Sequence, residues 1–218
     1  PDGKKYIAGA DGRKVSSGFV DTTDGTTYYV KTDGTVAQGG IVKVSGAKYL
    51  AQDGGAIAKD GFFDTVKGST VYAYADGKLA SDKVIRVDGK KYFVKKNCAV
   101  AKNGFYTIPS GSTVYAKSNG ELALNKVITH KGKKFFAKAS GVIAKGGFYK
   151  TVSGNKVYAK KSGVLVTGKI FSVKGAKYYA GKSGAVAVKK WVKIGNKKYY
   201  CSVSGKITKV KKIRVKKN

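Results

Sequence analysis

Apolar positions along the chain fall in short runs that are separated by glycine turns. Runs such as "KYFV" and "TVYA" alternate with two-residue turns, as at Asp33-Gly34, Asp76-Gly77 and Asn119-Gly120. Aromatic and β-branched runs divided by such turns are typical of β-hairpins. A glycine turn interrupts the chain about every 10 residues, so no helical period survives and the pattern excludes helix.

The hairpin pattern repeats at a fixed spacing. An aromatic residue follows a turn every 43 residues, and an aliphatic residue recurs every 43 residues between these positions. The two series are Phe19, Phe62, Phe105, Phe148 and Trp191, and Ile41, Val84, Val127 and Ile170. Periods of this size indicate a repeat architecture. The pattern predicts one repeat module over residues 1–218, with a partial unit at 1–18, nine hairpin units of 22 or 21 residues at 19–210, and a basic tail at 211–218.

Within a unit, an apolar residue is followed by a turn, an aromatic pair, a second turn and an aliphatic residue that Ala usually follows. One hairpin cannot bury its own apolar face, so neighbouring hairpins must stack. The Ala positions suit a close approach of successive hairpins. We therefore predict an all-β, elongated solenoid of about ten stacked hairpins. The second member of each aromatic pair is expected to fill its core.

One turn departs from the pattern. Cys98 stands where other units have Gly55, Gly141 or Gly184, a position that favours a positive φ. Cys201 lies 103 residues away along the chain, about five units, which is too far for a disulfide. We expect two unpaired thiols.

Units such as "GKKYFVKKNCAVAKNG" and "GAKYYAGKSGAVAVKK" resemble the cell-wall-binding repeat superfamily. That group includes choline-binding repeats, glucan-binding repeats and the repetitive C-terminal regions of clostridial toxins. The resemblance covers nearly the whole chain. It implies a superhelical β-hairpin solenoid that attaches a secreted Gram-positive protein to wall polymers or glucans. Choline cages of that superfamily use Trp at the unit start, where only Trp191 stands here, and this departure counts against choline.

Charge is distributed unevenly. Residues 1–88 hold 12 Lys and Arg against 11 acidic residues, whereas residues 89–218 hold 32 against Glu121 alone. Solubility does not require so much charge of one sign, and self-repulsion disfavours the compact state. The balance favours an anionic polymer partner such as teichoic acid or an acidic polysaccharide. Nucleic acid ranks last, because no nucleic-acid-reading motif is present and the resemblance implies a place outside the cell.

The candidate binding residues are the lysines that precede the aromatic pair and the first ring of the pair. Neighbouring residues on a strand face opposite sides, so one ring of each pair can stay accessible to a sugar. The candidates are Lys91, Lys134, Lys177, Lys198, Tyr49, Tyr92, Phe135, Tyr178, Trp191 and Tyr199.

Catalytic chemistry is not expected. His130 is the single histidine, placed at a predicted hairpin turn, and most of the twelve acidic residues lie in turns. No metal-ligand spacing appears, so neither a metal nor a cofactor is predicted. No apolar run reaches the length of a membrane span, and neither Met nor a signal-peptide pattern occurs. We expect a processed part of a longer secreted, cell-surface protein whose upstream domain is not included.

Two other functions fit the same pattern. A module for a neutral glucan would rely on Tyr stacking and would be indifferent to salt. A structural stalk would hold a partner domain away from the cell without any ligand. Salt dependence of binding separates the first of these from an anionic-polymer module.

Overall fold

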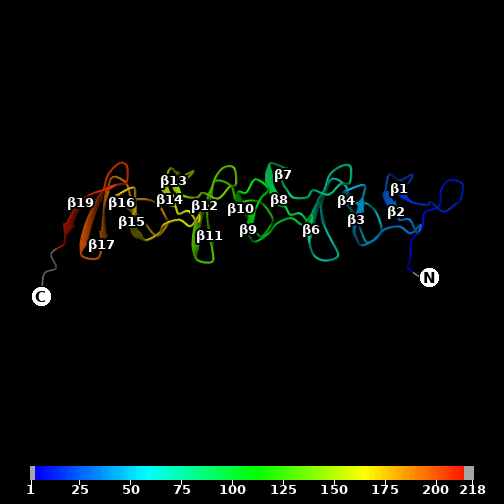
Figure 1. Ribbon diagram of the computed structural model, residues 1–218, viewed down its shortest axis with the longest axis horizontal. Helices are drawn as coiled ribbons and strands as arrows, with labels where there is room; N and C mark the ends of the chain where they lie inside the picture. The colour runs from blue at the N-terminus through cyan, green and yellow to red at the C-terminus, as the bar shows by residue number, and fades with distance from the viewer. Residues whose placement is uncertain (1–2, 214–218) are drawn as a thin grey trace. The chain divides into compact units, whose positions relative to one another are not determined.

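The computed structural model describes residues 3–213 of the chain. It divides into two compact units, which are considered separately. Unit 1 comprises Pro1–Gly111 and Ala116–Leu122, and unit 2 comprises Ser112–Tyr115 and Ala123–Asn218. Within the described residues every regular element is a β-strand, and the strands succeed one another along each unit as hairpins (Figure 1).

Unit 1 contains four complete antiparallel hairpins. They are β1 (Gly18–Asp21) with β2 (Thr27–Val30), β3 (Gly40–Val44) with β4 (Ala47–Ala51), β5 (Gly61–Asp64) with β6 (Thr70–Ala73), and β7 (Lys83–Val87) with β8 (Lys90–Val94). Strand β9 (Gly104–Thr107) follows, and β10 (Thr113–Ala116) lies where the two units divide. The register places the opening residue of a hairpin opposite the second member of its pair, as in Phe62↔Tyr72.

Unit 2 repeats the design and ends in a third strand. Its hairpins are β11 (Lys126–His130) with β12 (Lys133–Ala137), β13 (Gly147–Lys150) with β14 (Lys156–Ala159), β15 (Lys169–Val173) with β16 (Ala176–Ala180), and β17 (Lys190–Ile194) with β18 (Lys197–Cys201). Strand β19 (Ile207–Lys212) pairs with β18. It continues into the segment that the sequence suggested as a basic tail, because Lys212 still lies opposite Lys197. Residues 214–218 of that segment lie outside the described residues.

The second turn of a unit needs a left-handed residue. The backbone N–H of Gly34, at φ +77°, donates to the Lys31 carbonyl at 2.8 Å. Cys98 adopts the same conformation, at φ +68°, and its N–H donates to the Lys95 carbonyl at 2.9 Å. The expected positive φ of Cys98 is confirmed. Both cysteines are free and buried, as expected.

Stacking joins each hairpin to its successor through backbone and side chains. The N–H of Ile57 donates to the Thr27 carbonyl at 2.8 Å, and the N–H of Leu165 donates to the Lys134 carbonyl at 2.8 Å. The Ala that follows each aliphatic residue is sealed at the junction: Ala58 and Ala144 are both 0% exposed. An all-β solenoid of consecutive hairpins is therefore confirmed.

The core is filled by a different member of the pair in alternate hairpins. In three of the hairpins that Ile or Val opens, the second member is buried, as for Leu50 and Phe136, whereas in the Ile170 hairpin Tyr178 is buried and Tyr179 only half-buried. Where Phe opens the hairpin, the first member is buried instead at Val71, Val114 and Val157, and Tyr28 is half-buried. The expectation that the second member always fills the core is wrong for these hairpins. Their second members, Tyr29, Tyr72 and Tyr158, are only half-buried.

Candidate ligand-binding site: aromatic clusters and lysines on the hairpins

In unit 1, the opening Phe of a hairpin gathers two tyrosines around it. The Phe62 ring centroid lies 5.0 Å from that of Tyr72, its cross-strand partner, and 4.8 Å from that of Tyr92 in the next hairpin. Phe19 makes the same contacts at 5.2 Å with Tyr29 and at 4.7 Å with Tyr49. The spacing is the same in both clusters because one partner is set by strand register and the other by hairpin stacking.

Unit 2 holds a larger cluster of the same kind. The Phe148 centroid lies 4.9 Å from Tyr158 and 4.9 Å from Tyr178. Phe171 adds a fourth ring, stacked on Tyr178 at 5.5 Å with an interplanar angle of 26°. Tilted rings at such distances are favourable and leave π faces available to a ligand cation or to the apolar face of a sugar.

In the Phe19 and Phe62 clusters the most accessible ring is the opening residue. Phe19 is 43% exposed and Phe62 37%, whereas Tyr49 and Tyr178 are only 9% and 7% exposed. The expectation that the first ring of the pair stays accessible is therefore wrong for Tyr49 and Tyr178. Both are buried because they pack beneath the opening Phe. The recurrence of an aromatic residue at the unit start was the sequence signal for the exposed position.

The other predicted rings differ in exposure. Tyr92, Phe135 and Tyr199 are half-buried, and Trp191 is 40% exposed. Trp191 contacts Tyr200, with ring centroids 5.4 Å apart. Of the predicted residues, Tyr49, Tyr92 and Tyr178 therefore belong to clusters around an opening Phe.

The predicted lysines lie on strands, and their backbones take part in stacking. Lys91 and Lys134 are half-buried, and their carbonyls accept the N–H groups of Leu122 and Leu165. Lys177 and Lys198 are exposed. Other lysines, which sequence reasoning missed, donate to a threonine hydroxyl of the preceding repeat: Lys59 to Thr27 at 2.6 Å, Lys102 to Thr70 at 2.8 Å and Lys145 to Thr113 at 2.9 Å.

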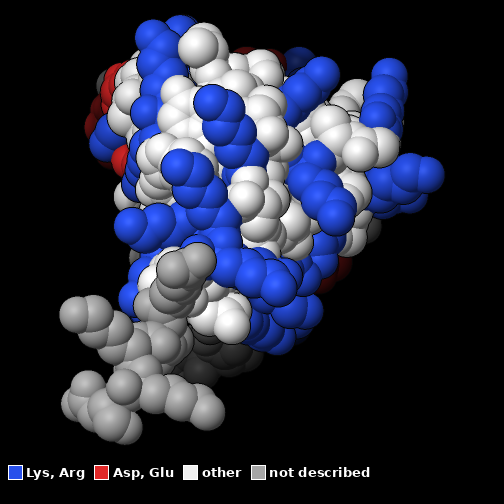
Figure 2. Space-filling model, turned by 90° about the vertical axis from the view of Figure 1, so that its left-hand side faces the viewer, with Lys and Arg blue, Asp and Glu red and all other residues white. Residues whose placement is uncertain are grey.

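All the charged side chains in the sequence of unit 2 are basic. Its sequence contains 26 Lys and Arg residues and no Asp or Glu. Figure 2 shows Lys and Arg side chains spread over the face that carries the last strands of this unit. Lys198 of β18 lies opposite Lys193 on one side and Lys211 on the other. Like charges placed directly across strands are destabilising, so this arrangement is not explained by stability.

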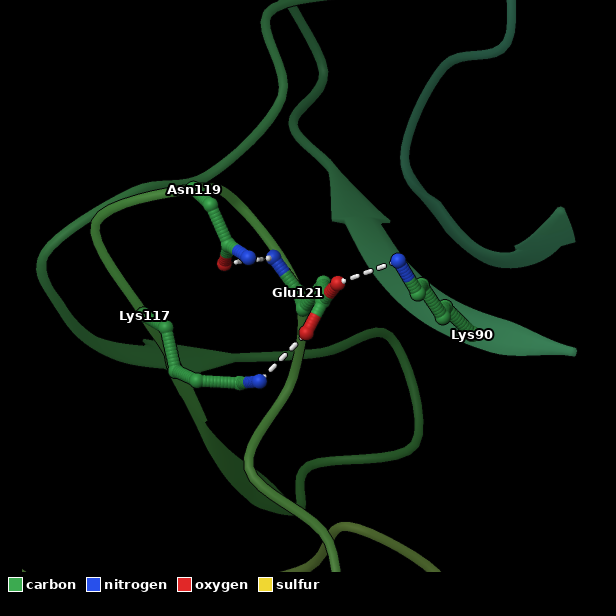
Figure 3. A network of polar contacts seen from close by, with 4 residues as sticks. All are labelled: Lys90, Lys117, Asn119 and Glu121. Carbon is green, nitrogen blue, oxygen red and sulfur yellow. Dashed lines mark hydrogen bonds and ion pairs between the residues drawn. The ribbon is translucent and has the colours of Figure 1, made fainter. Parts of the chain in front are cut away.

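Unit 1 carries all twelve acidic residues, and Asp76 and Glu121 form ion pairs with its lysines. Lys90 lies 3.0 Å from one carboxylate oxygen of Glu121, and Lys117 donates to the other (Figure 3). The N–H of Glu121 in turn donates to the Asn119 side-chain oxygen at 3.1 Å. The hydrogen bonds from Lys117 and then Lys90 lower the pKa of Glu121 to about 2. Glu121 is therefore ionised at neutral pH.

Acidic side chains also surround the Phe62 cluster. The pKa of Tyr72 is raised by burial first and then by the charges of Asp60 and Asp88, with the neighbouring Tyr74 contributing. Glu121 bridges by its backbone to Tyr92, the third ring of the cluster. This cluster thus combines aromatic faces with nearby negative charge.

His130 is the last residue of β11 and pairs with Lys133 across the hairpin turn, next to the place that the sequence suggested. Its ring packs against Tyr115, with centroids 5.5 Å apart. Across residues 3–213 no group of three His, Cys, Asp or Glu is placed to hold a metal ion. In the same range no helix is long and apolar enough to cross a membrane.

Comparison with known proteins matches one unit of the chain to a family. Residues 189–207 match the family model described as a putative cell wall binding repeat. The segment 189–207 carries the cell wall binding repeat. This confirms the resemblance stated from the sequence, and the matched segment covers β17 and β18, with Trp191 at its start. No curated protein matches the chain.

Solved structures share the fold that this repeat builds. The modular autolysin LytC of Streptococcus pneumoniae superposes with a TM-score of 0.73 at 24% identity, covering 97% of this chain and 46% of that one. Choline binding protein F of the same organism gives 0.69 at 22% identity, covering 94% and 75%. The choline-binding domain of CbpL, also from S. pneumoniae, gives 0.65 at 24% identity, covering 90% and 100%. The present chain thus spans about half of LytC.

Proposed function

We propose that this chain is a non-catalytic module that attaches its parent protein to an anionic polymer of the cell wall, such as teichoic acid or an acidic polysaccharide. The observation that carries the proposal is unit 2, with its 26 basic residues and no acidic residue on the same hairpins that unit 1 uses. The match to the cell wall binding repeat supports a wall ligand. The parent protein would be secreted and held at the cell surface.

Binding would be multivalent. Exposed lysines such as Lys133, Lys177 and Lys198 recur on three of the four hairpins of unit 2, so a linear polyanion meets a series of weak contacts. Linking weak sites raises the overall affinity through effective concentration. Each neutralised charge also releases a counterion, so affinity should fall steeply as salt rises.

The test is cosedimentation of the full chain with purified walls, prepared with and without teichoic acid, at about 50 mM and about 500 mM salt. Screening changes several-fold over this range. We expect binding to walls that retain teichoic acid, and release in high salt. Equal binding at both salt concentrations would reject the proposal and favour a neutral glucan. Binding to no wall fraction would favour a structural stalk.

A quaternary ammonium group such as choline is a second candidate ligand, for unit 1. The Phe19 and Phe62 clusters each present three rings, with Phe and Tyr in place of the missing Trp. Cations bind the faces of such rings, and the acidic residues around Phe62 add attraction. Choline at millimolar concentration would then displace the chain from walls that carry choline, whereas an equal concentration of sodium chloride would not.

A further inference from the structure

The Phe148 cluster of unit 2 has the ring geometry of the Phe62 cluster but different charges around it. Three positions that are equivalent by the repeat change together. Thr70, Asp88 and Glu121 of the Phe62 cluster correspond to Lys156, Lys174 and Lys206 of the Phe148 cluster. Two acidic residues and a neutral one are thus replaced by three lysines.

Two of these lysines line a groove beside the rings. The groove has a volume of about 600 Å³, and its walls include Phe148, Tyr158, Tyr178, Lys174 and Lys206. Small-molecule sites are typically concave, about 300–1,000 Å³ in volume, and lined by aromatic residues with a few polar groups. Lys206 is fixed there by a backbone bridge to Tyr178, and Glu121 makes the equivalent bridge to Tyr92.

The third lysine places its ammonium group against the rings. The Lys156 Nζ lies 4.2 Å from the Phe148 centroid and 5.7 Å from the Tyr178 centroid, and it donates to the Ser204 carbonyl at 3.0 Å. A cation within about 6 Å of a ring centroid is attracted to it. The rings of this cluster therefore already hold a cation that belongs to the protein.

The equivalent position in unit 1 is built differently. The hydroxyls of Thr27 and Thr70 accept from Lys59 and Lys102, one hairpin further along. The Phe148 cluster has Val188 at the position of those lysines, and Val188 is 40% exposed. In unit 1 a lysine of the next hairpin donates to the threonine at this position, whereas in the Phe148 cluster the lysine occupies the position itself and lies against the rings.

We propose that the groove at Phe148 binds an anionic sugar unit, a hexose that carries a phosphate or a carboxylate, and that it rejects quaternary ammonium groups. The aromatic rings stack on the apolar face of the sugar ring, and Lys174 and Lys206 pair with the anion. A quaternary ammonium is repelled by Lys156, Lys174 and Lys206, and unit 2 has no acidic side chain to offset them. This inference rests on the proposed function and names the part of the wall polymer that one site recognises.

The experiment transfers the charges of the Phe62 cluster to the Phe148 cluster in the full chain. The variant K156T/K174D/K206E uses residues that the same fold accepts at equivalent positions. The control K161T/K182D/K209E makes the same change of charge at exposed lysines of unit 2 that do not line the groove. The probes are glucose 1-phosphate, glucuronate, glucose and choline, titrated by calorimetry, and circular dichroism verifies the fold of each variant.

We expect the parent chain to bind glucose 1-phosphate or glucuronate and to bind glucose at least about tenfold more weakly. Whichever of the two anions binds more tightly shows whether the site recognises a phosphate or a carboxylate. K156T/K174D/K206E should lose at least about tenfold in affinity for that anion, and the control less than about twofold. The triple variant should also bind more choline than the parent chain.

The inference is overturned if neither anion binds, if glucose binds as well as the anions, if K156T/K174D/K206E keeps the affinity of the parent chain, or if the control loses as much affinity as that variant. The wall assay keeps this test separate from that of the proposed function. Suppose that K156T/K174D/K206E binds the anionic sugars as tightly as the parent chain does, and that the parent chain binds walls in a salt-dependent manner. In that case only the present inference fails. If the parent chain binds no wall fraction, the proposed function fails.

Discussion

The Phe62 cluster of unit 1 and the Phe148 cluster of unit 2 share one arrangement of three rings but differ in the charged residues around it. Both place an opening Phe within about 5 Å of two tyrosines, one across the hairpin and one in the next hairpin. Asp60, Asp88 and Glu121 accompany the first, whereas Lys156, Lys174 and Lys206 accompany the second. The comparison shows that ring geometry is fixed by strand register and stacking, while the surrounding charge is free to diverge.

That freedom has a physical basis in the repeat. The buried positions at the junction, such as Ala58 in unit 1 and Ala144 and Val166 in unit 2, carry small or medium-sized apolar residues because neighbouring hairpins pack tightly there. The charged positions lie at turns and strand ends that solvent reaches, so a change of sign costs little packing. Ligand preference can therefore differ between units of one solenoid without a change of fold.

The largest effects are expected from the core, and they should be similar in both units. Leu50→Ala in unit 1 and Phe136→Ala in unit 2 each remove a side chain that is at most 3% exposed. We expect each to lower the free energy of unfolding by about 3 kcal/mol or more, because both leave a cavity. Urea unfolding followed by circular dichroism measures the loss. A loss below about 1 kcal/mol in one unit would show that the two cores are not equivalent.

Reversing the charge of surface lysines should weaken wall binding by different amounts in the two units, whereas truncation of the core should affect both units alike. Lys133, Lys177 and Lys198 of unit 2 are exposed, as are Lys31, Lys43 and Lys67 of unit 1. We expect reversal of the unit 2 set to Glu to weaken wall binding at about 50 mM salt by at least about 30-fold, because counterion release is lost. Reversal of the unit 1 set should weaken it less than about threefold, since acidic residues already offset its lysines. Equal losses would remove the distinction between the units.

How well the sequence predicts a feature depends on how far apart along the chain the contacting residues lie. Hairpins, turns and the positive φ of Cys98 are local, and the pattern of residues predicted them correctly. The clusters depend on contacts between hairpins, such as Phe19 with Tyr49, 30 residues apart. Which ring lies uppermost in such a contact is set by stacking geometry. For this reason the sequence pointed to Tyr49 and Tyr178 as accessible, although Phe19 and Phe148 lie over them.

Lowering the pH should destabilise unit 1 and not unit 2, because all the Asp and Glu residues belong to unit 1. The pKa of Glu121 is lowered to about 2 from 4.5, so its stabilising contribution is present above pH 4.5 and is lost as pH falls toward 2. The pKa values of Asp24 and Asp33 are also lowered, mainly by hydrogen bonds from nearby threonines. We expect the protection of amides against exchange to fall more in unit 1 than in unit 2 on acidification from pH 5 to pH 2, measured by mass spectrometry.

Glu121→Gln provides the control for that experiment. At pH 7 it should make the amides around Lys90 and Lys117 exchange faster, because both lysines lose their carboxylate partner. Since the Glu121 carboxylate of the parent chain is half protonated near its pKa of about 2, the difference between the two proteins should become much smaller at pH 2. A difference that persists unchanged at pH 2 would mean that the ion pairs do not cause it.

The smallest effect concerns the turn at Cys98 and its counterpart at Gly184 in unit 2. Cys98 holds φ at +68°, and its side chain is buried in a cluster with Leu50 and Val71. Cys98→Gly relieves the unfavourable φ, a gain of about 1 kcal/mol, but it also loses the apolar contacts of the thiol, a loss of similar size. We therefore expect Cys98→Gly to change the free energy of unfolding by less than about 1 kcal/mol.

Cys98→Ala separates the two terms. It loses the sulfur atom and keeps the strain, so Cys98→Ala should be less stable than Cys98→Gly by about 1 kcal/mol, the reverse of the usual order of Ala and Gly in strands and helices. Gly184→Ala in unit 2 should show the same strain, because φ is +92° there and the new Cβ lies 3.4 Å from Leu165 Cδ1, an ordinary contact. Thermal unfolding of the three variants, compared at equal pH, measures the order. Cys98→Ala as stable as Cys98→Gly would show that burial of the side chain, and not the backbone conformation, decides which residue this turn accepts.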